Sequence, residues 1–232
     1  MSFALECIDD SVSGWRAYRD HPWIERLADG SLTLEQFVFF HEFDTSFSAD
    51  MHRALALGVA KAPAGCDWAR AAIRVLHETF IADKRASKED LLARLNQARP
   101  VRMDRMIRGL SRDAYANHLL RVAWEQPIGA IAAALLPCAM FTEIIGTRFA
   151  ASPPASEPEI VKWAQGYVNE RDMSLTASHI EMMDTYSATG GSTGRESMRQ
   201  EFTRSVAYQT RVFDAALAVT DRYTEEERSD GR

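Results

Sequence analysis

An acidic side chain lies on what helical periodicity predicts to be an apolar face. Asp44 shares that face with Phe37, Phe40, Phe47 and Met51, which follow one another at spacings of three or four residues. A carboxylate removed from water is costly unless it is paired or hydrogen-bonded. We therefore interpret Asp44 either as a structural ion pair or helix cap, or as a carboxylate that faces a ligand in the centre of a helical bundle.

A proline and a cysteine end the most apolar run of the chain. Cys138 follows directly after Pro137 in the segment AIAAALLPC. A buried cysteine is often only a small apolar side chain, but its thiolate is also a strong nucleophile. A proline inside a helix leaves one carbonyl without its donor, and the resulting kink can shape a cavity beside the sulfur. Cys138 is therefore the candidate nucleophile.

Three further polar side chains lie on predicted helix faces that are otherwise apolar. Tyr115 is on the same predicted helix face as Leu119, and Tyr167 is one helical turn after Trp163. Gln209 stands among the apolar residues of the last predicted helix. A buried hydroxyl or amide needs a hydrogen-bond partner. Each of these side chains therefore either hydrogen-bonds to another part of the protein core or contacts a ligand.

The spacing of apolar residues predicts helices throughout the chain and no strand. Scarce Gly and Pro residues mark the breaks, including a loop at 188–194. The expected helical segments are 11–27 (one or two helices), 33–61, 67–97, 101–126 (a short element and then a helix), 127–149, 159–187 and 195–223. Seven or eight helices without a long linker predict a single all-α domain over residues 1–232, with its site built from side chains on buried faces.

Charge and cysteine content narrow the classes of function. The chain has 27 Lys and Arg against 33 Asp and Glu residues, a net charge of −6, which argues against nucleic acid as a partner. The three cysteines are too few for a disulfide framework, and Cys7 lies in a segment that we expect to be loose. The N-terminus has no apolar signal segment, and the longest apolar run, 128–140, is too short to span a bilayer. We expect a cytoplasmic protein with no membrane partner.

Several segments resemble the TenA family of thiaminase II enzymes, which also act as aminopyrimidine aminohydrolases. The resemblance covers roughly residues 10–218 and is carried by HPWIERLADGSLTLEQFVFF, RALALGVAKAP, YANHLLRVAWEQPIGAIAAALLPCAMFTEIIG, WAQGY and VFDAAL. Its most specific element is ALLPC together with the upstream Tyr115. The resemblance implies a haem-oxygenase-like helical bundle, a homo-oligomer (tetramer or dimer) and a small aminopyrimidine-like substrate. We expect no cofactor.

The resemblance also implies roles for the buried polar residues. Cys138 matches the nucleophile that adds to the pyrimidine ring. Asp44 matches the carboxylate that holds the aminopyrimidine edge through charge-assisted hydrogen bonds. Tyr115 and Tyr167 match tyrosines that stack on the ring and hydrogen-bond to it.

Three positions depart from the family pattern. Gln209 stands where the family has a glutamate that serves as the general acid, and Phe47 and Thr142 stand where it commonly has tyrosines. An amide can hydrogen-bond but cannot donate a proton as an acid does. The thiamin-related hydrolysis is therefore in question, although substrate binding at Phe47, Thr142 and the two tyrosines is still expected.

Three alternatives to a thiamin-related hydrolase stay open. The first is an enzyme repurposed for another small molecule in a specialised biosynthetic pathway, and the second is a ligand-binding protein without catalysis. The third is a metal-dependent oxidase on the same fold, which needs several carboxylates and histidines around one cavity. Its candidate ligands are His41, Asp44, His77, Glu78, Glu143 and His179. Because their spacing is poor, we interpret the histidines as surface or capping groups and expect no metal site.

Overall fold

The computed structural model describes residues 2–81, 90–91, 93–95, 109–151, 158–170 and 175–219. All regular structure within these residues is helical, which confirms the all-α fold class. The helices are α1 (Phe3–Asp10), α2 (Val12–Arg19), α3 (Pro22–Asp29), α4 (Leu34–Lys61), α5 (Asp67–Ile81), α7 (Leu110–Glu125), α8 (Ile128–Ala151), α9 (Pro158–Glu170), α10 (Thr176–Thr189) and α11 (Gly191–Ala218).

Besides the helical residues 90–91 and 93–95, the described residues thus contain ten helices, more than the seven or eight expected. One reason is that residues 3–29 form three short helices, separated at Ser11 and at Asp20–His21. Another is that two helices, α9 and α10, occupy the expected 159–187 segment. The continuation of the expected 67–97 helix past Ile81, and the short element expected near residue 101, lie mostly outside the described residues.

The loop expected at 188–194 is instead a tight corner between α10 and α11. Gly191 has a φ of 62°, in the left-handed region that favours glycine. A Cβ added at the neighbouring Gly190 would lie 2.7 Å from the ring of Tyr186. Glycine at both positions therefore lets α11 begin almost directly after α10.

The start of α4 is fixed by its capping residues. Thr33 Oγ1 accepts a hydrogen bond from the backbone N–H of Gln36, and Gln36 Oε1 accepts one from the backbone N–H of Thr33. The Gln36 amide also donates to the carbonyl of Leu217 at 2.8 Å. The cap therefore joins the beginning of α4 to the end of α11.

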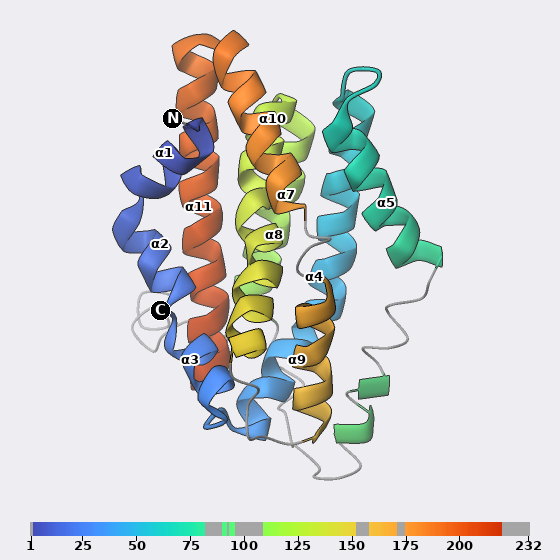
Figure 1. The fold of residues 1–232 in the computed structure, drawn as a ribbon, viewed down its shortest axis with the longest axis vertical. Helices are drawn as coiled ribbons and strands as arrows, with labels where there is room; N and C mark the ends of the chain where they lie inside the picture. Colours follow the sequence, from blue (N-terminus) through green and yellow to red (C-terminus); the bar gives the residue numbers. More distant parts are fainter. Residues whose placement is uncertain are drawn as a thin grey trace, which may run out of the picture.

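The helices pack around α8. Helix α8 contacts α11, α10 and α9 extensively, and α4 pairs mainly with α7. In Figure 1, α4, α8 and α11 follow the long axis of the molecule, with α1–α3 along the outer side of α11 and α5 along the outer side of α4. Side chains on α4, α7, α8 and α11 therefore meet in the interior.

The length of helix α8 contradicts the expectation that no apolar segment of the chain could span a bilayer. It continues past the apolar run at 128–140 to Ala151, so it is long and apolar enough to cross a membrane by length and composition alone. However, 61% of its most apolar window is buried inside the protein. This burial is what the central helix of a bundle requires.

Proline inside α8 does not end the helix. The helix runs through Pro137, and the hydroxyl of the fully buried Tyr18 donates a hydrogen bond to the Pro137 carbonyl at 2.7 Å. This contact ties α2 to α8 beside Cys138.

Acid is expected to destabilise the fold as the pH falls from about 6.5 towards about 4. Burial lowers the pKa of His118 from 6.5 to about 4 and that of His179 to about 3. Both rings are therefore neutral in the folded protein over a range where the unfolded chain protonates them. Stability is full above pH 6.5, and protonation removes up to about 3 kcal/mol for His118 and up to about 5 kcal/mol for His179 as the pH falls towards each folded-state pKa. Urea unfolding at a series of pH values measures the loss.

A matched variant separates this effect from the titration of carboxylates. His118→Gln removes one titrating ring while keeping a side chain that can hydrogen-bond to Ser205. Its free energy of unfolding is expected to fall less steeply with acid than that of the wild type. An unchanged slope would show that His118 is not responsible.

Candidate active site

The pairing of α4 with α7 brings two opposite charges together in the interior. Nη2 of Arg112 lies 3.2 Å from Oδ1 of Asp44, and the two side chains are only 5% and 14% exposed. Asp44 thus has the ion pair that its burial requires. Sequence reasoning missed Arg112. The available signal was its place on α7 one turn before Tyr115, on the same buried face.

Aromatic rings surround this ion pair. The guanidinium of Arg112 lies 4.4 Å from the ring centroid of Phe40 and 4.9 Å from that of Phe47. Phe47 in turn stacks on Tyr115, with ring centroids 5.0 Å apart. Phe47 therefore offers a stacking surface beside the charges, without the hydroxyl of a tyrosine.

Tyr115 connects this group of residues to the cysteine. The ring is fully buried, and burial raises the pKa of its hydroxyl well above the usual range, with the nearby charge of Cys138 raising it further. Ser205 and Gln209 lie close enough to oppose this rise in pKa. The hydroxyl nevertheless has no hydrogen-bond partner of good geometry among the described residues. Tyr115 is therefore a buried donor open to a ligand.

Cys138 lies half-buried on α8, in electrostatic reach of two tyrosines. Its charge contributes to the raised pKa values of Tyr18 and Tyr115, and Arg112 opposes both rises. Thr142, one turn further along α8, is also half-buried. Cys138, Tyr115 and Arg112 thus occupy one neighbourhood.

Tyr167 approaches from α9. It is half-buried and contacts Trp163 at 4.7 Å and Phe141 at 5.5 Å between ring centroids. Phe141 belongs to the same helix as Cys138. Asp44, Cys138 and Tyr167 are therefore all partly shielded from solvent.

Gln209 lies on α11 on the inner side of the bundle, with 4% of its surface exposed. It faces Tyr115, whose pKa it helps to hold down. One turn further along, Phe213 stacks on Phe40 and on Trp23. The Gln209 amide is therefore one turn from a group of stacked rings that includes Phe40, which packs against Arg112.

A buried polar chain behind Tyr115 was not foreseen from the sequence. Ser205 Oγ lies 3.0 Å from Nε2 of His118, and Nδ1 of His118 lies 3.7 Å from Oε2 of Glu201. Glu201 is 3% exposed and also pairs with Arg121 and Arg204, which reach the surface. The His118 ring is neutral near pH 7 because its pKa is about 4. This chain positions Ser205 beside the Tyr115 hydroxyl.

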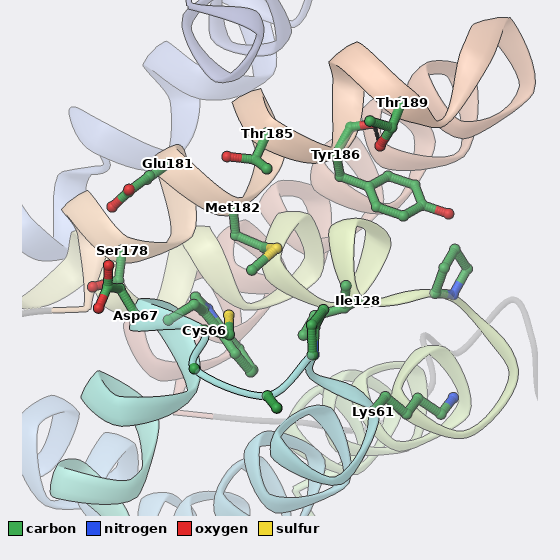
Figure 2. A pocket seen from close by; sticks show the side chains of 15 residues that line it. Lys61, Cys66, Asp67, Ile128, Ser178, Glu181, Met182, Thr185, Tyr186 and Thr189 are labelled. Carbon is green, nitrogen blue, oxygen red and sulfur yellow. Dashed lines mark hydrogen bonds between the residues drawn. The ribbon is translucent and has the colours of Figure 1, made fainter.

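The other two cysteines lie away from this neighbourhood. Cys7 is fully buried in α1, and burial raises its pKa to about 12, so the expectation of a loose N-terminal segment is wrong. Cys66 is half-buried and lines a surface cavity of about 680 Å³ between the α4–α5 connection, the start of α8 and α10. Figure 2 shows Met182 and Ile128 facing each other across this cavity. Asp44, Cys138 and Gln209 do not line it.

The candidate metal ligands do not gather in the part of the chain that the structure describes, where no three His, Cys, Asp or Glu side chains form a group. The interpretation of the histidines as surface or capping groups fails for two of them. His179 is buried and accepts a hydrogen bond from Trp68 Nε1 at 2.9 Å, and His41 is buried against Trp163. His77 is exposed, as expected.

Comparison with known proteins adds a family match over most of the chain. The profile described as "TENA/THI-4/PQQC family" matches residues 9–218. An aminopyrimidine aminohydrolase from Halalkalibacterium halodurans is 27% identical over 187 residues, which cover 79% of this chain and 81% of that protein. One from Bacillus subtilis is 21% identical over 216 residues, covering 93% of this chain and 90% of that protein.

Solved structures agree on the fold. A TenA homologue from P. horikoshii superposes with a TM-score of 0.75 at 20% identity, covering 94% of this chain and 99% of that one. A TenA family protein from Silicibacter sp., described as a transcription regulator, also has a TM-score of 0.75, at 21% identity, with coverage of 94% and 96%. The helical bundle described above is therefore the fold of these proteins.

Proposed function

Because the chain belongs to the TENA/THI-4/PQQC family, we propose that it is a hydrolase that uses Cys138 as a nucleophile on a thiamin-related aminopyrimidine. The observation that carries the proposal is the shared neighbourhood of Cys138, Tyr115 and the Arg112–Asp44 pair. The names of the two aminohydrolase relatives support the choice of substrate class.

In the proposed reaction, the thiolate of Cys138 adds to a ring carbon of the pyrimidine and the group on the exocyclic methylene leaves with its bonding electrons. Water then adds to the methylene carbon, loses a proton, and the ring expels the thiolate. Asp44 accepts a hydrogen bond from the exocyclic amino group. Phe47, Tyr115 and Tyr167 provide aromatic surface for the ring, and Thr142 lies one turn from the nucleophile.

A second candidate is an enzyme of the same fold that acts on a different small molecule. The specific observation in its favour is that Asp44 is already paired with a buried arginine. The loss of two tyrosine hydroxyls, at Phe47 and Thr142, and of a carboxyl, at Gln209, also alters what the site can recognise.

Cysteine footprinting tests the proposal. Iodoacetamide is expected to alkylate Cys66, which borders an open cavity, and to spare Cys7, which is buried with a pKa of about 12. An aminopyrimidine is expected to slow the alkylation of Cys138 and to leave that of Cys66 unchanged. Mass spectrometry of tryptic peptides gives the three rates. Equal alkylation of Cys138 with and without the ligand would contradict the proposed site.

Assembly and location belong to the same proposal. We infer one domain over residues 1–232, a homo-oligomer and a cytoplasmic location. Trp124 at the end of α7 is 73% exposed, which suits an interface between copies of the chain. All three cysteines are free, as in a reducing compartment. Light scattering of the purified protein measures the mass of the assembly.

A further inference from the structure

We propose that Arg112 binds an oxyanion of the substrate, a carboxylate or a phosphate, beside Asp44. The inference rests on the proposed function in one respect: the proposed function supplies the identity of the ring to which the oxyanion is attached. It assigns a specificity-determining residue that stands outside the sequence motifs carrying the family resemblance.

The first argument is the unmet hydrogen bonding of the guanidinium. Its Nε and Nη2 atoms are buried and have no hydrogen-bond partner among the described residues, although Asp44 approaches Nη2 at 3.2 Å. The N–H groups of Nε and Nη2 point from one edge of the guanidinium in parallel. This edge is the one that binds both oxygens of a carboxylate or phosphate.

The second argument is that the guanidinium is held in place before any ligand binds. Phe40 and Phe47 pack against it at 4.4 Å and 4.9 Å, and its side chain is only 5% exposed. The Tyr115 hydroxyl, one turn along α7, is another buried donor: Ser205 and Gln209 lie near it, but it makes no hydrogen bond of good geometry within the described part of the chain. Leaving such donors unpaired is unfavourable, and a ligand oxyanion would satisfy them.

Asp44 makes the recognition selective. Its carboxylate attracts an amino N–H of the ligand but repels an oxyanion, whereas Arg112 attracts the oxyanion. A ligand that carries both groups can satisfy both side chains. Removing the charge of Asp44 should therefore weaken the binding of a ligand that offers only an amino N–H and strengthen the binding of a ligand that carries an oxyanion.

Calorimetric titration of three related probes tests the inference. The probes are an aminopyrimidine with a neutral hydroxymethyl substituent, the same ring with a carboxylate in its place, and the phosphate monoester of the first. Wild-type protein is expected to bind at least one of the charged probes about tenfold or more tighter than the neutral probe. Arg112→Gln is expected to abolish this preference, and the charged probe that the wild-type protein prefers identifies the oxyanion.

Two further variants keep the test independent of folding. Asp44→Asn is expected to tighten binding of the charged probe and weaken that of the neutral one. Arg121→Gln removes a second arginine of α7, which is 40% exposed and pairs with Glu201, and is expected to leave the preference intact. Equal affinity of all probes for the wild type, or a preference that survives Arg112→Gln, would overturn the inference.

An aromatic acid without the aminopyrimidine ring, benzoate, separates this inference from the proposed function. If benzoate binds in an Arg112-dependent manner but no aminopyrimidine does, the oxyanion site stands and the proposed substrate ring is wrong. If the neutral aminopyrimidine binds and protects Cys138 but charge brings no advantage, the proposed function stands and the oxyanion site is wrong.

Discussion

Replacement of Cys138 by alanine is expected to lower kcat/KM for the substrate by on the order of 10³-fold or more, because the covalent route to the product is lost. Binding should persist, since Asp44, Tyr115 and Phe47 keep their side chains. Steady-state turnover and calorimetric affinity, measured on the same preparation, separate the two effects.

The matched control for this variant is Cys66→Ala, which removes the thiol of the surface cavity and should leave kcat/KM unchanged. Cys138→Ser preserves size but supplies a far weaker nucleophile near neutral pH, so it should resemble the alanine variant. Wild-type turnover in Cys138→Ala would mean that the bundle catalyses its reaction without this sulfur.

Gln209→Glu is expected to raise turnover of thiamin or its aminomethyl-pyrimidine fragment by about 10²-fold, because it restores a group that can donate a proton. Gln209 is only 4% exposed and faces Tyr115, so the introduced carboxyl would be largely removed from water. Burial raises the pKa of a carboxyl, which suits an acid that must stay protonated near neutral pH. The gain should therefore disappear as the pH rises above the pKa of this carboxyl.

Gln209→Met is the control, because it fills a similar volume and can neither donate a proton nor hydrogen-bond strongly. It should not accelerate turnover at any pH. Rapid hydrolysis of thiamin by the wild type would show that another group supplies the proton. Slow wild-type turnover without any gain in Gln209→Glu would favour the second candidate, in which the site serves a different substrate.

The N-terminal region shows which features could be predicted from the sequence and which could not. The helix boundaries near His21–Pro22 and Gly30 could be predicted, because proline and glycine have distinctive local backbone preferences. The burial of Cys7 could not be found in this way. Its exposure depends on how α1 packs against α10 and α11, which are formed by residues far away in the chain.

The sequence by itself determined the helical character of the chain and the inward faces of its long helices, because helical periodicity and capping are local properties of the chain. It therefore identified Asp44, Tyr115, Cys138 and Gln209 as polar side chains turned inward. Only the tertiary structure decided which of them share a neighbourhood. The pairing of α4 with α7 gave Asp44 its partner Arg112, and the packing of α11 against α7 put Glu201 and Ser205 beside His118. A periodic pattern gives the inward face of a helix, but which helix that face meets, and in what register, is decided by packing across the whole core.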